Sequence, residues 1–307
     1  DLKPGEGLKL NCNPEIDKDG NNVPDNLDVE GPIDWSNCYL RGLNLSNLEL
    51  SGANLLGAVL YGANLSNTNL SGANISYAQI YKVNLSNTNL TYANLSYSNL
   101  CGASFGLVGE DVRGVIGRVA FDFTGTNLSH TDFDHAHLSD AILTDAIVKH
   151  TNFHDSNLSG VDLSGRDLTG TILTEADLSN ANLDGVDLDG RDLTGTILAG
   201  VDLDGRDLTG TILTGADLSN ANLDGVDLSG RDLTGTILAG VDLSGKDLTG
   251  TILTEADLSN ANLDSVDLDG RDLTGTILAG VDLSGKDLTG TILTGADLSN
   301  ANLDSVD

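Results

Sequence analysis

An apolar residue recurs every five residues through most of this 307-residue chain, and this period constrains the fold more than any other feature. The first run has 15 such centres, from Trp35 to Phe105, and the second has 37, from Phe123 to Leu303. Of the 52 centres, 44 are Leu. A helix repeats every 3.6 residues and a strand every two, so neither places these centres on one face. A fixed period of this kind predicts a solenoid, in which each unit buries its apolar residue by stacking on its neighbours.

The residues before each centre follow a second rule. A mostly small residue stands two places before the centre and Asn or Asp stands between them, as in Ala53-Asn54-Leu55. This pattern resembles the pentapeptide-repeat family, whose consensus is Ala-Asp/Asn-Leu-x-x. The resemblance implies an all-β, right-handed parallel β-helix of quadrilateral section, in which four pentads form a 20-residue coil. The centre and the residue two before it face inward. At this coil length the 52 centres predict about 13 coils.

The second run supports the 20-residue coil independently. The residues two before each centre repeat as a block that begins at Val186 and again at Val226 and Val266, a period of 40 residues, or two such coils. We expect four regions: an N-terminal cap over 1–32, a first solenoid run over 33–107, an interruption over 108–120 and a second run over 121–307.

Two points about these regions remain open in the sequence. The interruption is either a bulge accommodated within a coil, or an ejected loop or short helix, which in some family members carries partner contacts. The second run stops within a repeat, whereas a solenoid normally closes with a polar cap, so we expect the run to continue beyond residue 307.

Composition excludes several functions. Lys and Arg total 15 and Asp and Glu total 46, so the net charge is −31. This balance excludes a basic nucleic-acid-binding surface. No apolar run is long enough for membrane insertion. Neither a nucleophile–base pair nor a phosphate-binding glycine loop can be identified, and the flat faces of a solenoid lack a concave pocket. We therefore predict a protein that is not an enzyme and has no small-molecule substrate.

A calcium site is predicted near the N-terminus. Oxygen donors occupy positions 1, 3, 5, 7, 9 and 12 of the loop over residues 17–28, which is the spacing that Ca2+ requires. The segment also resembles the calcium loops of thrombospondin type 3 repeats, although Asn22 stands where a second Gly is usual. The alternative is an unliganded acidic turn. We expect a structural calcium ion that orders the cap on the first coil. Its ligands are Asp17, Asp19, Asn21, the carbonyl of Val23, Asp25 and Asp28.

Three cysteines bear on the cellular compartment. Cys12 and Cys38 bracket the calcium loop, and a disulfide between them staples the cap to the first coil. Cys101 is left over, either as a small apolar residue or as an intermolecular link. The sequence lacks Met and starts at Asp1, so we expect a processed N-terminus from which a secretory signal has been removed. Together these features predict an extracellular or cell-surface protein.

Residues 20 apart stack on one face, and they predict a column of carboxylates. Such closely spaced like charges repel one another. Because a buried unpaired guanidinium is costly, we expect the cations at normally inward positions to bend outward and pair with the column. The carboxylates are Asp167, Asp187, Asp207, Asp227, Asp247, Asp267, Asp287 and Asp307. The cations are Arg166, Arg206, Lys246 and Lys286 on the same face and Arg191, Arg231 and Arg271 on the next.

Seven isoleucines stand where Asp or Asn is the rule, and the resemblance implies that they face outward on two adjoining sides. They form either a lateral contact stripe or ordinary exposed aliphatic positions copied with the repeat. They are Ile172, Ile197, Ile212, Ile237, Ile252, Ile277 and Ile292.

Histidines suggest a second metal site. His130 and His150 are one coil apart, and His135 stacks over Asp155. Imidazole and carboxylate together can bind a transition metal, and the alternative is that these residues fill tolerant outward positions.

These features favour a non-enzymatic extracellular structural protein, a stalk, sheath or filament subunit that presents acidic ladders and associates with other copies laterally or end to end. A first alternative is an acidic DNA mimic, because some pentapeptide-repeat proteins occupy the DNA-binding groove of type II topoisomerases. A second is an ice-binding solenoid that uses threonine ladders such as Thr169, Thr171 and Thr174.

Overall fold

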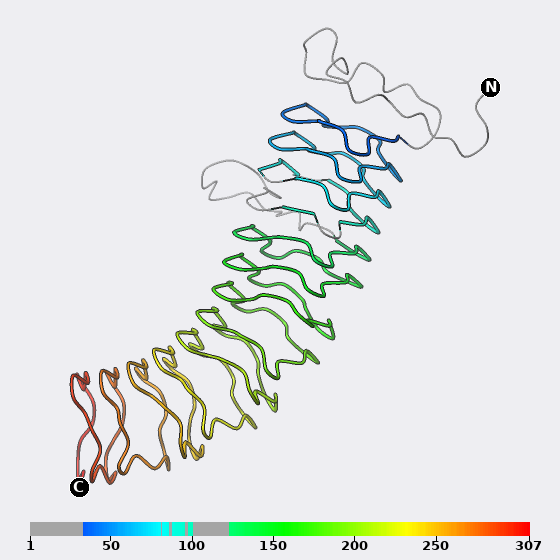
Figure 1. Ribbon diagram of the computed structural model, residues 1–307. Helices are drawn as coiled ribbons and strands as arrows, with labels where there is room; N and C mark the ends of the chain where they lie inside the picture. Colours follow the sequence, from blue (N-terminus) through cyan, green and yellow to red (C-terminus); the bar gives the residue numbers. More distant parts are fainter. Residues whose placement is uncertain (1–32, 81, 86–87, 96–97, 101–122) are drawn as a thin grey trace, which may run out of the picture. The chain divides into compact units, whose positions relative to one another are not determined.

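The computed structural model describes residues 33–80, 82–85, 88–95, 98–100 and 123–307. The chain forms two compact units, Asp1–Ile172 and Leu173–Asp307, and in each the backbone winds through successive stacked coils (Figure 1). The predicted cap over 1–32 and the interruption over 108–120 lie outside the described residues. No helix in the described part of the chain is long and apolar enough to cross a membrane.

Strand structure consists of single-residue parallel bridges with a constant register. Bridges such as Asn54↔Asn74 and Asp217↔Ile237 join residues 20 apart, so the predicted coil of four pentads is confirmed. Across the interruption the partners are 33 apart, as in Asn94↔Asn127. Thirteen extra residues are therefore passed over, and the same faces continue on the other side.

Each pentad divides into a bridge residue, a core residue, a two-residue turn and an inward residue. In the pentad around Leu55, Asn54 forms the bridge and Leu55 is fully buried. The amide of Ala58 donates to the Leu55 carbonyl (3.0 Å), and Gly57, the third residue of this turn, has φ 66°. A positive φ at that turn position favours Gly or Asn. The carboxamide of Asn54 also accepts the amide of Leu56 (3.3 Å), which fixes the turn after the bridge.

The core is a continuous stack of the pentad centres. Leu40, Leu60 and Leu238 are completely buried, and Trp35 is buried among the first coils. Burial of each such leucine stabilises the fold by roughly 1.5–3 kcal/mol. The core therefore runs along each unit.

Corner geometry makes one glycine much less replaceable than its neighbour. Gly225 and Gly230 have φ 68° and 67°, but a Cβ on Gly225 would lie 3.0 Å from the Gly205 Cα, whereas one on Gly230 would meet nothing within 4 Å. Both Ala variants carry the strain of a positive φ, about 1 kcal/mol or more. We expect Gly225→Ala to lose roughly 1–3 kcal/mol more stability than Gly230→Ala, because backbone cannot move aside.

Urea unfolding of the two variants, followed by circular dichroism, checks this difference. The amide of Gly205 donates to the Asp224 carbonyl (2.7 Å), so movement of this corner also strains a coil-to-coil hydrogen bond. Equal losses in the two variants contradict the expectation.

Candidate functional site

The outward face that carries the Asp column is the most strongly charged surface of the second unit. All of its members from Asp187 to Asp307 are exposed. The carboxylate of Asp207 accepts the amide of Thr209 (2.8 Å). Hydrogen bonds from the Thr209 side chain and backbone lower the pKa of Asp207, although the charge of Asp227 in the next coil opposes this. In the equivalent turn two coils later, hydrogen bonds from the Thr249 side chain and backbone lower the pKa of Asp247. The column is therefore a line of exposed carboxylates, in which Asp207 and Asp247 are held in the ionised form at neutral pH.

The inward cations do not serve this column as expected. Lys246 Nζ donates to the carbonyls of Leu223 (2.5 Å) and Val226 (3.2 Å) in the preceding coil. Arg271 Nη1 donates to the carbonyl of Leu248 (2.5 Å) in the same way. The prediction that these side chains bend outward to the Asp column is therefore wrong for Lys246, whose charge is satisfied by backbone carbonyls. Arg271 also donates to backbone carbonyls, but its charge helps to lower the pKa of Asp247 in the column, as that of Arg231 does for Asp207.

Other ion pairs join residues that were not predicted from the sequence to be partners. Arg206 Nη2 lies 2.9 Å from the carboxylate of Asp184, a corner residue that does not belong to the column. In the first unit Asp167 does have a cation partner, but it is Lys149, at 2.7 Å, and this ammonium lowers the pKa of Asp167 strongly. The carboxylate nearest to Arg166 is that of Asp145 (4.0 Å).

Backbone pairing between coils is asymmetric in the second unit. On the face that contains Asp177, Ile197 and Asp217, bridges or paired backbone hydrogen bonds join every coil to the next, and we call this face the spine. On the face of the Asp column, no bridge joins successive members from Asp187 to Asp287, all of which are described. The two remaining faces are bridged at alternate coils.

The inward side chain accounts for this asymmetry. Ile197 and Asp217 are bridged, while the same outward pair at Ile212 and Asp232 is not. The inward residue of the upper coil is Ala216 in the first case and Arg231 in the second. The outward charges are therefore not decisive, and a bulky inward residue holds the upper coil away from the lower one. Valine alone does not always do so, because the Asn84 amide beside Val83 still donates to the Ala63 carbonyl (3.1 Å).

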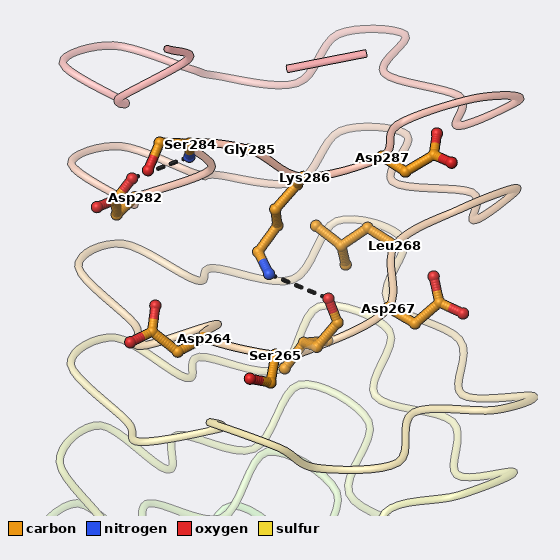
Figure 2. Close-up of a pocket in the computed structure, with 10 residues that line it drawn as sticks. Asp264, Ser265, Asp267, Leu268, Asp282, Ser284, Gly285, Lys286 and Asp287 are labelled. Atoms are coloured by element: carbon orange, nitrogen blue, oxygen red, sulfur yellow. Dashed lines mark hydrogen bonds between the residues drawn. The ribbon is translucent and has the colours of Figure 1, made fainter. Parts of the chain in front are cut away.

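One open coil pair encloses a pocket of about 490 Å³ between residues 264–268 and 282–287 (Figure 2). Lys286 crosses this space and its Nζ donates to the Val266 carbonyl (3.1 Å). Asp267 and Asp287 point away from the lysine at the rim. The Lys286 ammonium thus donates to a backbone carbonyl that would accept from an amide of the next coil if the two coils were paired. The arrangement holds the ammonium charge in place between the two coils.

The isoleucines face outward as expected, and their exposure differs by face. Ile212, Ile252 and Ile292 are each 47% exposed, whereas Ile197 and Ile277 on the spine are 36% and 37% exposed. Ile237 is half-buried, and Ile172 ends the first unit at 48%. We call the faces of the second unit that carry these residues the Ile faces. Ile and Asp alternate along both faces, so each isoleucine has aspartates as its column neighbours.

Comparison with known proteins identifies the repeat. The sequence matches the profile of pentapeptide repeats in eight copies, over residues 38–76, 68–106, 122–160, 156–195, 202–240, 232–270 and 272–304. The chain belongs to the pentapeptide-repeat family. Its fold is the right-handed quadrilateral β-helix of that family. Among curated proteins, no significant match is found.

Solved pentapeptide-repeat structures resemble parts of the chain. A protein from the Arabidopsis thaliana thylakoid lumen is 24% identical over 41% of this chain and 66% of its own, with a TM-score of 0.27. HetL, involved in heterocyst differentiation regulation in the cyanobacterium Nostoc, is 25% identical over 88% of this chain and 91% of its own, with a TM-score of 0.21. QnrB1, a plasmid-mediated fluoroquinolone resistance protein, is 18% identical over 78% of this chain and 90% of its own, with a TM-score of 0.31. These similarities carry no functional information for this chain.

The two residue pairs of the predicted transition-metal site in this pentapeptide-repeat protein lie on separate corners. The rings of His130 and His150 stack at 4.7 Å, while His135 Nδ1 lies 2.6 Å from the carboxylate of Asp155. The described residues hold no group of three or more His, Cys, Asp or Glu that could bind a metal ion. The four residues therefore form two pairs, and a transition-metal site remains a prediction without structural support.

The predicted calcium ligands and Cys12 lie outside the described residues, as does Cys101. Cys38 is buried and disulfide-bonded. The pairing with Cys12 and the calcium loop remain predictions. Two further isoleucines that were not predicted as part of the stripe, Ile142 and Ile147, are 41% and 48% exposed. Their signal was present, because both stand one place before a pentad centre.

The role of the inward residue can be tested at Arg231. The Nε atom of Arg231 is buried without a hydrogen-bond partner in the described structure. Replacement by Thr recreates the pair Thr131 and Thr151, where the Asn152 amide donates to the Thr131 carbonyl (2.9 Å). We expect Arg231→Thr to close the open coil pair, slow exchange of the Asp232 amide and raise stability by about 1 kcal/mol.

Amide hydrogen exchange monitored by NMR gives the measurement. Arg231→Lys is the matched control, because it keeps the bulk and the charge and should leave the Asp232 amide unprotected. The Asp217 amide, which already donates to Thr196 (2.9 Å), serves as an internal reference. Unchanged exchange at Asp232 in Arg231→Thr contradicts control by the inward residue.

Proposed function

We propose that this chain is a non-enzymatic structural protein of the cell exterior, a stalk, sheath or filament subunit that associates side by side with other copies through its Ile faces. The observation that carries the proposal is the equal 47% exposure of Ile212, Ile252 and Ile292 at every second coil. Half-exposed aliphatic side chains that recur at a fixed interval offer another copy a matching row of apolar contacts.

A second copy has matched spacing for such a contact. Coil-to-coil distances in a parallel β-structure are about 4.8 Å, so equivalent isoleucines recur at roughly twice that distance along the face. Any other copy has the same repeat, so its isoleucines recur at the same intervals. Burial of a half-exposed isoleucine contributes up to roughly 1 kcal/mol, and the small gain is multiplied along the face.

Charge opposes this association. Aspartates alternate with the isoleucines, and the chain carries a net charge of −31. Exposed charges are screened beyond about 8 Å at physiological ionic strength. Lateral association should therefore strengthen with added salt or divalent cations. Exterior location is supported by the disulfide-bonded Cys38 and by the calcium loop expected from the sequence.

Replacing isoleucines on one face tests the proposal. We expect Ile212→Ser with Ile252→Ser to weaken self-association by about tenfold or more, because two apolar contacts per copy are lost. Sedimentation velocity over a concentration series, at 0.15 M and 0.5 M NaCl (roughly physiological and high ionic strength), measures the effect.

The matched control is Asp227→Ser with Asp267→Ser, which changes the same number of residues on the Asp column. This variant should associate at least as well as the wild type, since it removes repulsion. A wild type that stays monomeric at every concentration and salt level, or an isoleucine variant that associates normally, contradicts lateral association.

The Asp column favours a second candidate function. A line of exposed carboxylates on a repeating frame suits the basic DNA-binding groove of a type II topoisomerase, as the resemblance to the family implied. Under this function, the protein inhibits DNA supercoiling by gyrase, and Asp207→Asn with Asp227→Asn and Asp247→Asn reduces the inhibition by about tenfold. The double isoleucine variant is the control and should inhibit normally. A gyrase assay without any effect of the wild type removes this candidate.

Ice binding receives no support from the threonine contacts. The Thr171 hydroxyl donates to the Leu168 carbonyl (2.7 Å), and the Thr194 hydroxyl donates to the Asp192 carboxylate (2.6 Å). These hydroxyls are already engaged within the chain. Ice binding and end-to-end assembly stay predictions from the sequence.

A further inference from the structure

A group of exposed aromatic and basic residues covers one face of the first unit. Tyr39 is the outward residue of the column that continues to Val59 and Gln79, and it is 77% exposed. Arg41 and Tyr61 stack on the corner that follows this face, where the guanidinium lies 4.6 Å from the ring centroid. Tyr77, on the corner that precedes the face, is 59% exposed. With the exposed Lys82, these residues form what we call the Tyr–Arg patch.

Two members of the patch hold an unfavourable backbone conformation. Tyr77 has φ 57° and Lys82 has φ 55°. The equivalent corner residues one coil earlier are Gly57 and Gly62, for which a positive φ is accessible without steric conflict. A bulky tyrosine in this region is uncommon. The same corner holds Asn37 and Gly57 in the two preceding coils and histidines at 130 and 150 further on, so a large side chain is kept at several of these strained positions, which points to a role other than stability.

The charge of the patch is also distinctive. Between residues 33 and 100 the described carboxylates are Asp34 and Glu49, and both lie on other faces, in the columns of Asn54 and Asn69. Within the described part of the chain, Arg41 and Lys82 form no ion pair. In contrast, Lys149, Arg206 and Lys246 are engaged with carboxylates or carbonyls of their own chain. The patch is thus an outward-facing basic surface in a strongly acidic protein.

Tyrosine and arginine are the residue types most enriched at protein interfaces. Both combine a large contact area with hydrogen-bond donors that suit carboxylates. The partner of this patch should therefore be a protein surface that presents carboxylates at regular intervals.

We propose that the Tyr–Arg patch of one copy binds the Asp column of a second copy. Arg41 and Lys82 belong to coils two apart, and Asp207 and Asp247 in the column are also two coils apart. Successive coils are bridged on the patch face, which places two coils about 10 Å apart there, and the column carries a carboxylate in every coil, so carboxylates recur along it at one-coil and two-coil intervals. The arginine can pair with one carboxylate and the lysine with the other, while Tyr39 and Tyr77 donate to carboxylates between and beside them.

This contact rests on the proposed self-associating role and adds a different interface to it. The patch and the column are different surfaces, so the contact is heterologous, and a bound pair still offers one free patch on one copy and one free column on the other. A contact of this kind propagates from copy to copy. The lateral contact through the Ile faces does not depend on it.

A charge-swap experiment with full-length chains separates the two interfaces. All chains carry Ile212→Ser and Ile252→Ser, so lateral association is weakened. A patch variant adds Arg41→Glu and Lys82→Glu, and a column variant adds Asp207→Arg and Asp247→Arg. We expect each added pair alone to lower self-association by at least about tenfold relative to the isoleucine background. A one-to-one mixture should restore association, because the altered patch then meets the altered column and each wild-type surface meets its counterpart.

Sedimentation velocity and light scattering of the three proteins and the mixture give the readout, and thermal melting establishes that each variant is folded. Association that is unchanged in both variants, or a mixture of folded variants that fails to associate, overturns the proposal. Loss of association in the isoleucine background relative to wild type, together with no effect of the charge swaps, retains lateral association and removes this contact. If the isoleucine changes have no effect and the charge swaps lower association, the lateral contact is removed and the contact between the patch and the column is retained.

A corner variant tests the patch without new charges. Tyr77→Gly with Lys82→Gly copies the corner residues of the preceding coil. We expect its melting temperature to equal or exceed that of the wild type, while self-association falls by about tenfold. Gly57→Ala with Gly62→Ala is the control that strains the same corners without altering the patch, and it should lower stability and leave association unchanged at temperatures where it is folded. Undiminished association of the corner variant overturns the proposal.

Discussion

The side chain two places before each pentad centre is the contact on which the coil stack depends. It lies inside the coil and touches the coil beneath, so its volume sets how closely the two backbones approach. Alanine at 176 and 216 and threonine at 196 and 236 permit both backbone hydrogen bonds along the spine. Threonine also donates its hydroxyl to the carbonyl of the centre in the preceding coil, as Thr196 does to Leu173 (3.0 Å). Small size is the requirement for closing a coil pair, and one well-placed donor is the requirement for engaging the carbonyl beneath it.

Lysine and arginine meet only the second of these requirements. Lys246 and Arg271 reach the same carbonyl position that threonine uses, 23 residues earlier in the chain, but their bulk leaves the coil pair open. The opening in turn frees backbone acceptors, and the Val266 carbonyl accepts from Lys286 in place of an amide. An inward cation is therefore tolerated, because the coil pair that it holds open leaves backbone carbonyls available to accept its hydrogen bonds. Hydrogen bonds to a charged donor are stronger than those between neutral groups, which offsets part of the lost ladder.

The sequence was sufficient to predict the 20-residue coil but not the partners of the inward cations, and the reason is physical. The Leu period and the Asn or Asp before each centre depend on one residue at a time, so the 20-residue register followed directly. The fate of Lys246 depends on whether two coils pair, and that depends on side chains in both. Reasoning from charge alone considered only carboxylates as partners and therefore favoured the Asp column. The strained corner at Tyr77 was visible as a departure from Gly57 one coil earlier, but its meaning required the exposure and the backbone angle. The calcium loop and the Cys12 pairing depend on residues outside the described structure.

The 40-residue period of the second run follows from the same constraint. With a one-coil repeat, every coil pair on a given face would have the same inward residue and would be uniformly open or uniformly closed. Alternation of Arg191 with Thr211 leaves one closed pair for each open pair on that face. Ile212 lies beside an open pair and is 47% exposed, whereas Ile197 on the closed spine is 36% exposed. Packing inside the coil thus sets both the interval and the exposure of the isoleucines outside it. A partner for the Ile faces must have a two-coil spacing, and a second copy of this chain has that spacing by construction.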